Sequence, residues 1–124
     1  SSERDVKDFA KKISDVKIDV LINNAGAYLD RCAGLADLTS EILEATFQTN
    51  TFGPLRMAQA LLSNLKKSSA PMLVNITSLM GSIADNESGG YYAYRMSKTA
   101  LNMFNKSFSL DHRDIVSLVL HPVG

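Results

Sequence analysis

Tyr94 and Lys98 are the residues whose types and spacing could transfer a proton. No glycine or proline occurs between residues 91 and 121, so a helix can begin near Tyr91 and carry both side chains on one face. A phenol is a poor proton donor or acceptor at neutral pH, and a nearby ammonium favours its ionised form. The pair therefore predicts a tyrosine adapted to acid–base chemistry. The alternative is a half-buried tyrosine beside a solvated lysine.

The composition of the chain argues against several classes of protein. The 124 residues predict one domain, residues 1–124, and 13 basic and 13 acidic residues leave no net charge. Without a basic excess we expect no nucleic-acid partner. No apolar run approaches the ~20 residues of a membrane span, and the first residues are not a signal peptide. The single cysteine, Cys32, lies in no metal-ligand cluster. We therefore expect a cytoplasmic protein without a membrane segment or a metal.

Three short apolar segments alternate with helical patterns along the chain. Strands are predicted over residues 18–22, 71–77 and 115–120, and helices over residues 3–15, 39–67 and 91–110. This alternation is typical of βαβ units, whose crossovers make a sheet parallel. Apolar residues at nearly every strand position predict that the strands are buried on both faces. The pattern thus predicts half of a doubly wound α/β sheet.

Small and polar residues follow the first two predicted strands. Asn23-Asn24-Ala25-Gly26 follows the first strand, and Ser78 follows the second. In open parallel sheets, ligands bind outside the carboxyl ends of the strands, so these residues are candidates for a binding site. The alternatives are an ordinary turn at residues 23–26 and a solvated or capping hydroxyl at Ser78.

Asn50 lies where the long second helix is expected to break. Gly53-Pro54 interrupts the apolar pattern, because a proline removes a backbone hydrogen bond and kinks a helix. Two helical pieces should therefore meet near Asn50, where a backbone carbonyl could accept a hydrogen bond from a water molecule. The alternative is that Asn50 caps the second piece.

Together these features resemble the short-chain dehydrogenase/reductase family. The residues that carry the resemblance occur in the family's order: Asn23-Asn24-Ala25-Gly26, Asn50, Ser78, and Tyr94 with Lys98. Residues 77–98 further resemble the C-factor and sniffer-type carbonyl reductase branch. The resemblance covers essentially the whole chain. It implies a partial Rossmann-like sheet of about three parallel strands, and an NAD- or NADP-dependent enzyme that interconverts a carbonyl and an alcohol by hydride transfer.

The resemblance also implies a catalytic role for each matching residue. Tyr94 would exchange a proton with the substrate oxygen, and Lys98 would assist it and bind the nicotinamide ribose. Asn50 would position a water that links Lys98 to solvent. Ser78 would bind the substrate oxygen, although its separation from Tyr94 is longer than in many members, which makes Ser82 a rival.

Further implications concern the cofactor and the partners. Asn23, Ala25 and Gly26 would line the cofactor groove together with Tyr94 and Lys98. The helices that carry Asn50 and Tyr94 form the usual dimer faces of the family, so a homo-oligomer, either a dimer or a tetramer, is expected. The other partner would be a small carbonyl or alcohol substrate, whose identity the sequence leaves open.

One family motif does not occur in these 124 residues. Members begin with a strand and a turn of the type Gly-x-x-x-Gly-x-Gly, which binds the pyrophosphate of the cofactor. Neither this turn nor the residue that selects NAD or NADP occurs here. The resemblance therefore implies a fragment that lacks the N-terminal nucleotide-binding βαβ unit and does not turn over efficiently alone. The alternative is a non-catalytic interaction or regulatory half-domain that closes its sheet edges as a homodimer.

Overall fold

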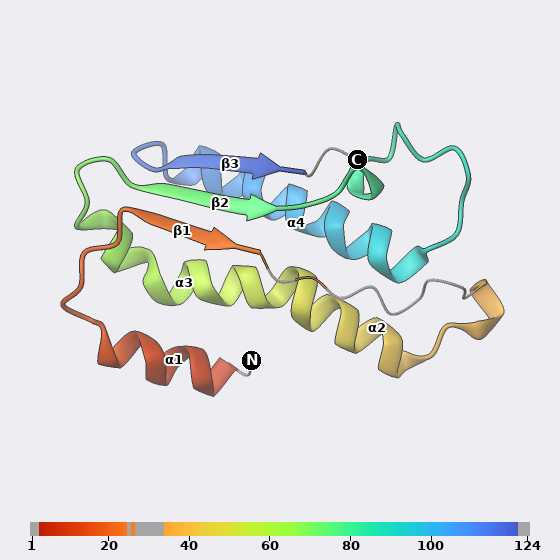
Figure 1. Ribbon diagram of the computed structural model, residues 1–124, viewed down its shortest axis with the longest axis horizontal. Helices are drawn as coiled ribbons and strands as arrows, with labels where there is room; N and C mark the ends of the chain where they lie inside the picture. The colour runs from red at the N-terminus through yellow and green to blue at the C-terminus, as the bar shows by residue number, and fades with distance from the viewer. Residues whose placement is uncertain (1–2, 25, 27–33, 122–124) are drawn as a thin grey trace.

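The computed structural model describes residues 3–24, 26 and 34–121. Figure 1 shows three strands side by side with helices on one side of them. The strands are β1 (Val20–Asn23), β2 (Met72–Ile76) and β3 (Val116–Leu120). The α-helices are α1 (Glu3–Lys12), α2 (Ser40–Phe47), α3 (Gly53–Lys66) and α4 (Tyr92–Asp111). The short elements are two 3₁₀ helices, η1 (Leu35–Asp37) and η3 (Leu79–Gly81), and a π-helical turn, η2 (Gln48–Phe52).

The three strands form one parallel sheet in the order β1-β2-β3. In this register Ile22 lies beside Val74, which lies beside Leu118, and Asn23 lies beside Asn75. All three strands therefore end at the same edge of the sheet. The predicted α/β fold with three parallel strands is confirmed.

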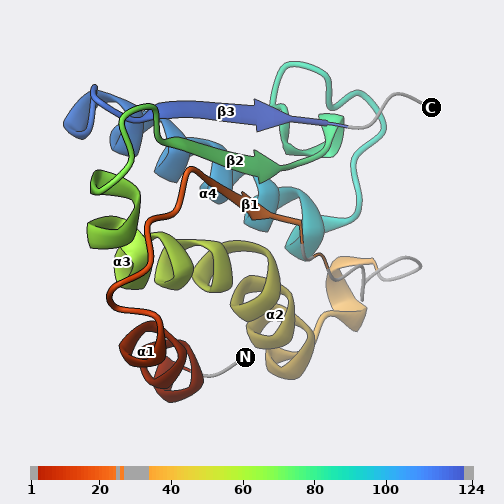
Figure 2. The ribbon, with the colours of Figure 1, turned by 60° about the vertical axis from the view of Figure 1, so that its left-hand side comes forward.

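The helices pack against one face of the sheet, which we call the covered face. α3 contacts β1 and β2, α4 contacts β3, and α1 packs on the outside of α3 (Figures 1 and 2). Leucines of α3 and of the strands meet there because their apolar positions recur at helical and strand spacing. The core comprises Leu21, Ala58, Leu61, Leu65, Leu73, Phe108 and Ile115. No helix in the described part of the chain is long and apolar enough to cross a membrane.

The opposite face of the sheet, which we call the open face, corrects the expectation that the strands are buried on both sides. Val20 is 49% exposed, Ile22 58% and Leu118 39%. Every described helix that packs on the sheet lies on the covered face, so alternate side chains of β1 and β3 face solvent. By register, the open face comprises Val20, Ile22, Met72, Val74, Ile76, Val116, Leu118 and Leu120.

The second helical segment breaks where the glycine–proline pair predicts, but it does so through a π turn. Thr39 caps α2, and its hydroxyl accepts a hydrogen bond from the N–H of Ile42 at 3.2 Å. α2 leads into η2, and η2 leads directly into α3, which has Pro54 in its first turn. The residue before α3 is Phe52, so the alternative in which Asn50 caps the second piece is wrong.

Other element boundaries differ from the prediction by a few residues. α1 ends at Lys12 rather than at residue 15, and β1 begins at Val20 and includes Asn23. α4 begins at Tyr92, one residue after Tyr91, which adopts a left-handed conformation with φ 53°. Helix ends fray and strand ends twist, so boundaries are less well defined by sequence than the elements themselves.

Candidate active site

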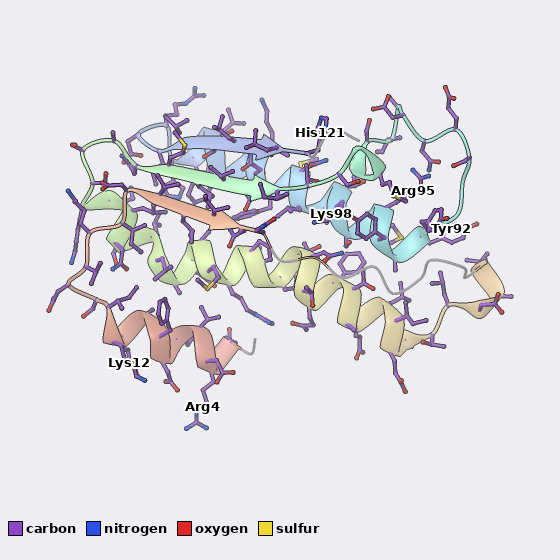
Figure 3. All side chains as sticks on the ribbon, in the orientation of Figure 1. Arg4, Lys12, Tyr92, Arg95, Lys98 and His121 are labelled. Carbon is purple, nitrogen blue, oxygen red and sulfur yellow. The ribbon has the colours of Figure 1, made fainter. Side chains whose placement is uncertain are left out.

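Lys98 is the buried cation near the carboxyl edge of the sheet. It extends from α4 toward the end of β2 (Figure 3), is 4% exposed, and its Nζ donates a hydrogen bond to the carbonyl of Ile76 at 3.2 Å. Burial lowers the pKa of Lys98 below its ordinary value, because desolvation disfavours the charged form. This lysine is therefore not the solvated residue of the alternative interpretation.

Tyr94 lies one helical turn before Lys98. The two residues share a face of α4, as their spacing predicts, and Nζ of Lys98 lies 5.9 Å from the centroid of the Tyr94 ring. Tyr94 is partly exposed while Lys98 is buried, so Tyr94 is the more solvent-accessible residue of the pair. This arrangement can exchange a proton with a ligand at the surface.

Gly26, three residues after Asn23 at the end of β1, lies close to Lys98. A Cβ atom built on Gly26 would lie 3.8 Å from Nζ of Lys98 and 3.9 Å from Oδ1 of Asn50. Three parts of the chain that are distant in the sequence therefore converge at this point: Gly26 after β1, η2 and α4. A longer side chain at position 26 would extend toward the lysine and the amide, so a glycine keeps room for a ligand beside them.

Asn50 connects η2 to the turn of α4 between Tyr94 and Lys98. It is fully buried, and its Nδ2 donates a hydrogen bond to Oγ of Ser97 at 3.0 Å. Oγ of Ser97 donates to the carbonyl of Tyr94 at 2.8 Å. The neighbouring Thr51 donates from its hydroxyl to the carbonyl of Ser97, also at 2.8 Å. The π turn thereby fixes the backbone that carries the tyrosine and the lysine.

The two rival serines occupy different surroundings. Ser78 lies two residues after Ile76, and its Oγ accepts a hydrogen bond from the N–H of Met80 at 3.1 Å. Ser82 accepts one from the N–H of Asp85 at 3.3 Å. Ser82 also lines an apolar groove of 500 Å³ with residues of α4 that lie on the helix side opposite Tyr94 and Lys98: Arg95, Met96, Thr99, Ala100 and Met103. Ser78 is thus the serine nearer in the chain to the carbonyl that binds Lys98.

A row of three asparagines crosses the covered face below this site. Nδ2 of Asn23 donates to Oδ1 of Asn75 at 2.8 Å, and Nδ2 of Asn75 donates to Oδ1 of Asn105 at 3.1 Å. All three side chains are buried. The row ties the end of β1 to β2 and then to α4. The Nδ2 group of Asn23 is thus hydrogen-bonded inside the fold.

Sequence reasoning missed Asn75, Asn105 and Ser97. A polar residue in the middle of an apolar strand was the available signal for Asn75, because a buried amide needs a partner. Asn105 lies seven positions after Lys98, two helical turns along the same face, and Ser97 precedes Lys98 directly.

Three further points concern ligand sites. A polar cavity of 310 Å³ lies beside η2 at the end of β1, and is lined by Ile22, Asn23, Asn24, Gln48, Thr49, Gly53, Pro54 and Met57. Ala25, expected in the cofactor groove, lies outside the described residues. Within residues 3–24, 26 and 34–121 no group of three or more histidine, cysteine, aspartate or glutamate side chains is arranged to hold a metal.

Comparison with known proteins identifies relatives over nearly the whole chain. A family model described as short chain dehydrogenase matches residues 1–119. The C-signal protein of Myxococcus xanthus is 45% identical over 116 residues, which cover 92% of this chain and 69% of that protein. The 1-hydroxy-2-glutathionyl-2-methyl-3-butene dehydrogenase of Rhodococcus sp. (strain AD45) is 37% identical over 127 residues, covering 98% of this chain and 54% of the enzyme.

Solved structures with the same fold include two carbonyl reductases. The NADPH-bound carbonyl reductase from chicken fatty liver superposes with a TM-score of 0.86 at 31% identity, over 98% of this chain and 54% of that one. The carbonyl reductase Sniffer of D. melanogaster gives a TM-score of 0.82 at 35% identity, over 97% and 53%. The chain spans about half the length of these structures.

Proposed function

The chain belongs to the short-chain dehydrogenase family, and we propose that its residues serve an NAD(P)-dependent oxidoreductase that interconverts a carbonyl and an alcohol. The observation that carries this proposal is the convergence of Gly26, Asn50 and Lys98, from three separate elements, beside the partly exposed Tyr94. The dehydrogenase and carbonyl reductases among the similar proteins support the same class of reaction.

We propose that the ribose and nicotinamide end of the cofactor binds beside Gly26, where the absence of a side chain leaves Lys98 and Asn50 approachable. Lys98 would hold the ribose through its ammonium, while the backbone at Gly26 and the residues around Ala25 and Asn23 would line the groove. The bound nicotinamide supplies or accepts the hydride. The chain's own residues orient the substrate and move the proton.

Tyr94 would exchange that proton with the substrate oxygen from its partly exposed position. Lys98 supports the ionised phenol as a nearby cation. Asn50 holds the backbone between these residues through Ser97, and we propose that it also positions a water leading from Lys98 to solvent. Ser78 would donate its hydroxyl proton to the substrate oxygen, while its oxygen accepts from the N–H of Met80. We favour Ser78 over Ser82 because Ser82 lines a groove on the other side of α4.

We propose that residues 1–124 act as the catalytic half of a short-chain dehydrogenase domain. They contain the proposed proton-transfer groups, and no glycine-rich turn of the Gly-x-x-x-Gly-x-Gly type. Efficient turnover should therefore require such a turn in addition. We further propose a cytoplasmic homo-oligomer that associates through the outer sides of the helices, where Met96 is 54% and Met103 67% exposed.

The first test is a fluorescence titration of the 124-residue chain with NADPH and with NADH. Saturable binding that is weakened at least about tenfold by Lys98→Met supports the proposed cofactor site. The comparison of the two cofactors gives the preference; the chicken carbonyl reductase binds NADPH, and a short-chain dehydrogenase/reductase from Burkholderia multivorans binds NADP.

The second test uses these residues fused behind a strand, glycine-rich turn and helix, with small ketones and aldehydes as substrates. We expect Tyr94→Phe to lower turnover about 10²–10⁴-fold without loss of cofactor binding. Tyr92→Phe is the matched control, since Tyr92 lies on the same helix and is 39% exposed (Figure 3). Folded protein that neither binds a cofactor nor responds to Tyr94→Phe contradicts the enzymatic proposal.

The second candidate function is a non-catalytic homodimeric module, and the exposed apolar residues of the open face favour it. Such a module should be a single dimeric species by sedimentation and should be indifferent to Tyr94→Phe.

A further inference from the structure

The segment between the two proposed catalytic elements is anchored on α4 at both of its ends. Residues 79–91 connect β2 and Ser78 to the helix that carries Tyr94. The first anchor is Gly81, whose carbonyl accepts a hydrogen bond from Oγ1 of Thr99 at 2.7 Å. A Cβ built on Gly81 would lie 2.9 Å from Cβ of Lys98, so the backbone touches the helix directly.

The second anchor is the side chain of Arg95. Its Nε donates to the carbonyl of Gly90 at 3.1 Å, and its Nη2 donates to Oγ of Ser88 at 3.2 Å. Its Cζ lies 6.0 Å from the centroid of the Tyr91 ring. One planar guanidinium therefore contacts three residues of the segment, a geometry that a lysine ammonium does not reproduce. Figure 3 shows Arg95 directed from the start of α4 toward this segment.

The backbone held by Arg95 is in an uncommon conformation. Gly89, Gly90 and Tyr91 have successive φ angles of 71°, 70° and 53°. The left-handed conformation is easy for glycine but unfavourable for a tyrosine, whose Cβ then lies too close to the following carbonyl oxygen. α4 also begins without a side-chain cap at Tyr91. The start of the helix thus depends on other contacts, and Arg95 supplies contacts to Ser88, Gly90 and Tyr91.

We propose that Arg95 is a positioning residue that fixes residues 88–91, and with them the first turn of α4, so that Tyr94 is presented at a constant distance from Ser78. The inference deepens the proposed function and rests on it for the role of Tyr94. Arg95 follows Tyr94 and points about 100° around the helix from it, so it acts through the backbone and not on the substrate.

Hydrogen exchange of the 124-residue chain tests the contacts of Arg95 with residues 88–91, which we call the Arg95 clamp, and needs no enzyme assay. In Arg95→Ala, backbone amides of residues 89–96 should exchange about five- to tenfold faster, the loss expected for one or two hydrogen bonds. Arg95→Lys should fall between wild type and alanine. Arg4→Ala is the matched control, because Arg4 is an exposed arginine on α1 (Figure 3) and should leave this segment unchanged. Equal exchange in Arg95→Ala and Arg4→Ala overturns the proposal.

A second variant and a kinetic readout complete the test. If Arg95→Ala does not fold, Ser88→Ala removes one of the contacts and should still accelerate exchange about two- to fivefold. In the fusion that turns over, Arg95→Ala should lower kcat about tenfold or more, with the Kd for NADPH within about twofold of wild type. An unchanged kcat beside faster exchange overturns the positioning role. Failure of the proposed function is distinct, because it appears as indifference to Tyr94→Phe whatever the exchange shows.

Discussion

The covered face and the open face of the sheet carry different side chains, although they alternate along the same three strands. The open face is apolar throughout, yet Ile22 is 58% and Val116 52% exposed. On β1 and β2 the covered face is apolar toward the amino ends, at Leu21 and Leu73, and bears the buried amides of Asn23 and Asn75 toward the carboxyl ends.

This difference shows that the buried polar side chains of the sheet lie on the covered face. A buried polar group is unfavourable unless it is hydrogen-bonded, so a cluster of buried amides, hydroxyls and one lysine requires a scaffold that satisfies them. The covered face provides such partners for the side chains of the asparagine row, and η2 and α4 provide them for Asn50. The open face has no comparable polar groups, and an exposed apolar patch of this kind marks an interaction surface or a tendency to aggregate.

The largest effect should come from the apolar end of the covered face. Leu73 is fully buried in the core, so Leu73→Ala should lower the free energy of unfolding by about 3–4 kcal/mol. Leu118→Ala, on the open face of the adjacent strand, is the control and should cost less than about 1 kcal/mol. Urea unfolding monitored by circular dichroism measures both. Similar losses for the two variants would show that the open face is buried in solution.

The next effect should come from the polar end of the covered face. Asn75→Ala removes two hydrogen bonds and leaves Asn23 and Asn105 without that partner, so we expect a loss of about 2–3 kcal/mol in unfolding free energy. A double-mutant cycle with Asn105→Ala should show a coupling of about 1 kcal/mol, measured by the same unfolding experiment. Strictly additive losses would mean that the row is not a connected unit.

Burial of Lys98 should lower the free energy of unfolding, whereas the hydrogen-bonded amides of the asparagine row should raise it. Burial of its charge is unfavourable, so Lys98→Met should raise the free energy of unfolding at neutral pH by about 1–2 kcal/mol while removing the proposed cofactor contact. Because the pKa of Lys98 is lowered in the folded state, the unfolded chain binds more protons between the two pKa values. Stability of the wild type relative to Lys98→Met should therefore increase as pH rises through that window. If the difference in unfolding free energy between Lys98→Met and the wild type increases with pH, the burial argument is wrong.

The smallest effect on stability should come from the open face. Ile22→Thr combined with Leu118→Thr replaces exposed apolar groups, so the free energy of unfolding should change by no more than about 1 kcal/mol. Binding of a hydrophobic dye and self-association in sedimentation velocity should both fall, because the apolar patch is broken. The matched pair on the covered face, Leu21→Thr with Leu73→Thr, should unfold the chain.

Much of the fold follows from periodicity in the sequence. The three strands, the helices between them and the break near Asn50 are recoverable because apolar residues recur at spacings of two or of three to four, and because Pro54 cannot continue an α-helical ladder. The exposure of β1 and β3 was not recoverable. A continuous apolar run indicates that a strand is suited to burial on both faces. It does not indicate whether residues 1–124 include the segments that would cover both faces.

The site was predictable only in its local parts. Spacing placed Tyr94 and Lys98 on one face, and strand ends identified Gly26 and Ser78. The link from Asn50 through Ser97 to the Tyr94 carbonyl depends on where η2 meets α4, which is a tertiary contact between residues far apart in the chain. The Arg95 clamp was hidden for the same reason, since an arginine beside a polar loop is ordinarily a solvated charge.

The π turn Gln48–Phe52 has a consequence for how the chain can change in length. A π turn closes with hydrogen bonds to residue i−5, so it holds about one residue more than an α turn, which corresponds to roughly 100° of rotation about the axis. α2 contacts α4, while α3 contacts β1 and β2 as well as α4, and the π turn η2 joins the two helices directly. Deleting a single residue of η2 would rotate α2 relative to α3 by about 100° and turn Asn50 away from Ser97. The helical segment from α2 through η2 to α3 should accept substitutions along its exposed side, but should not accept a one-residue insertion or deletion.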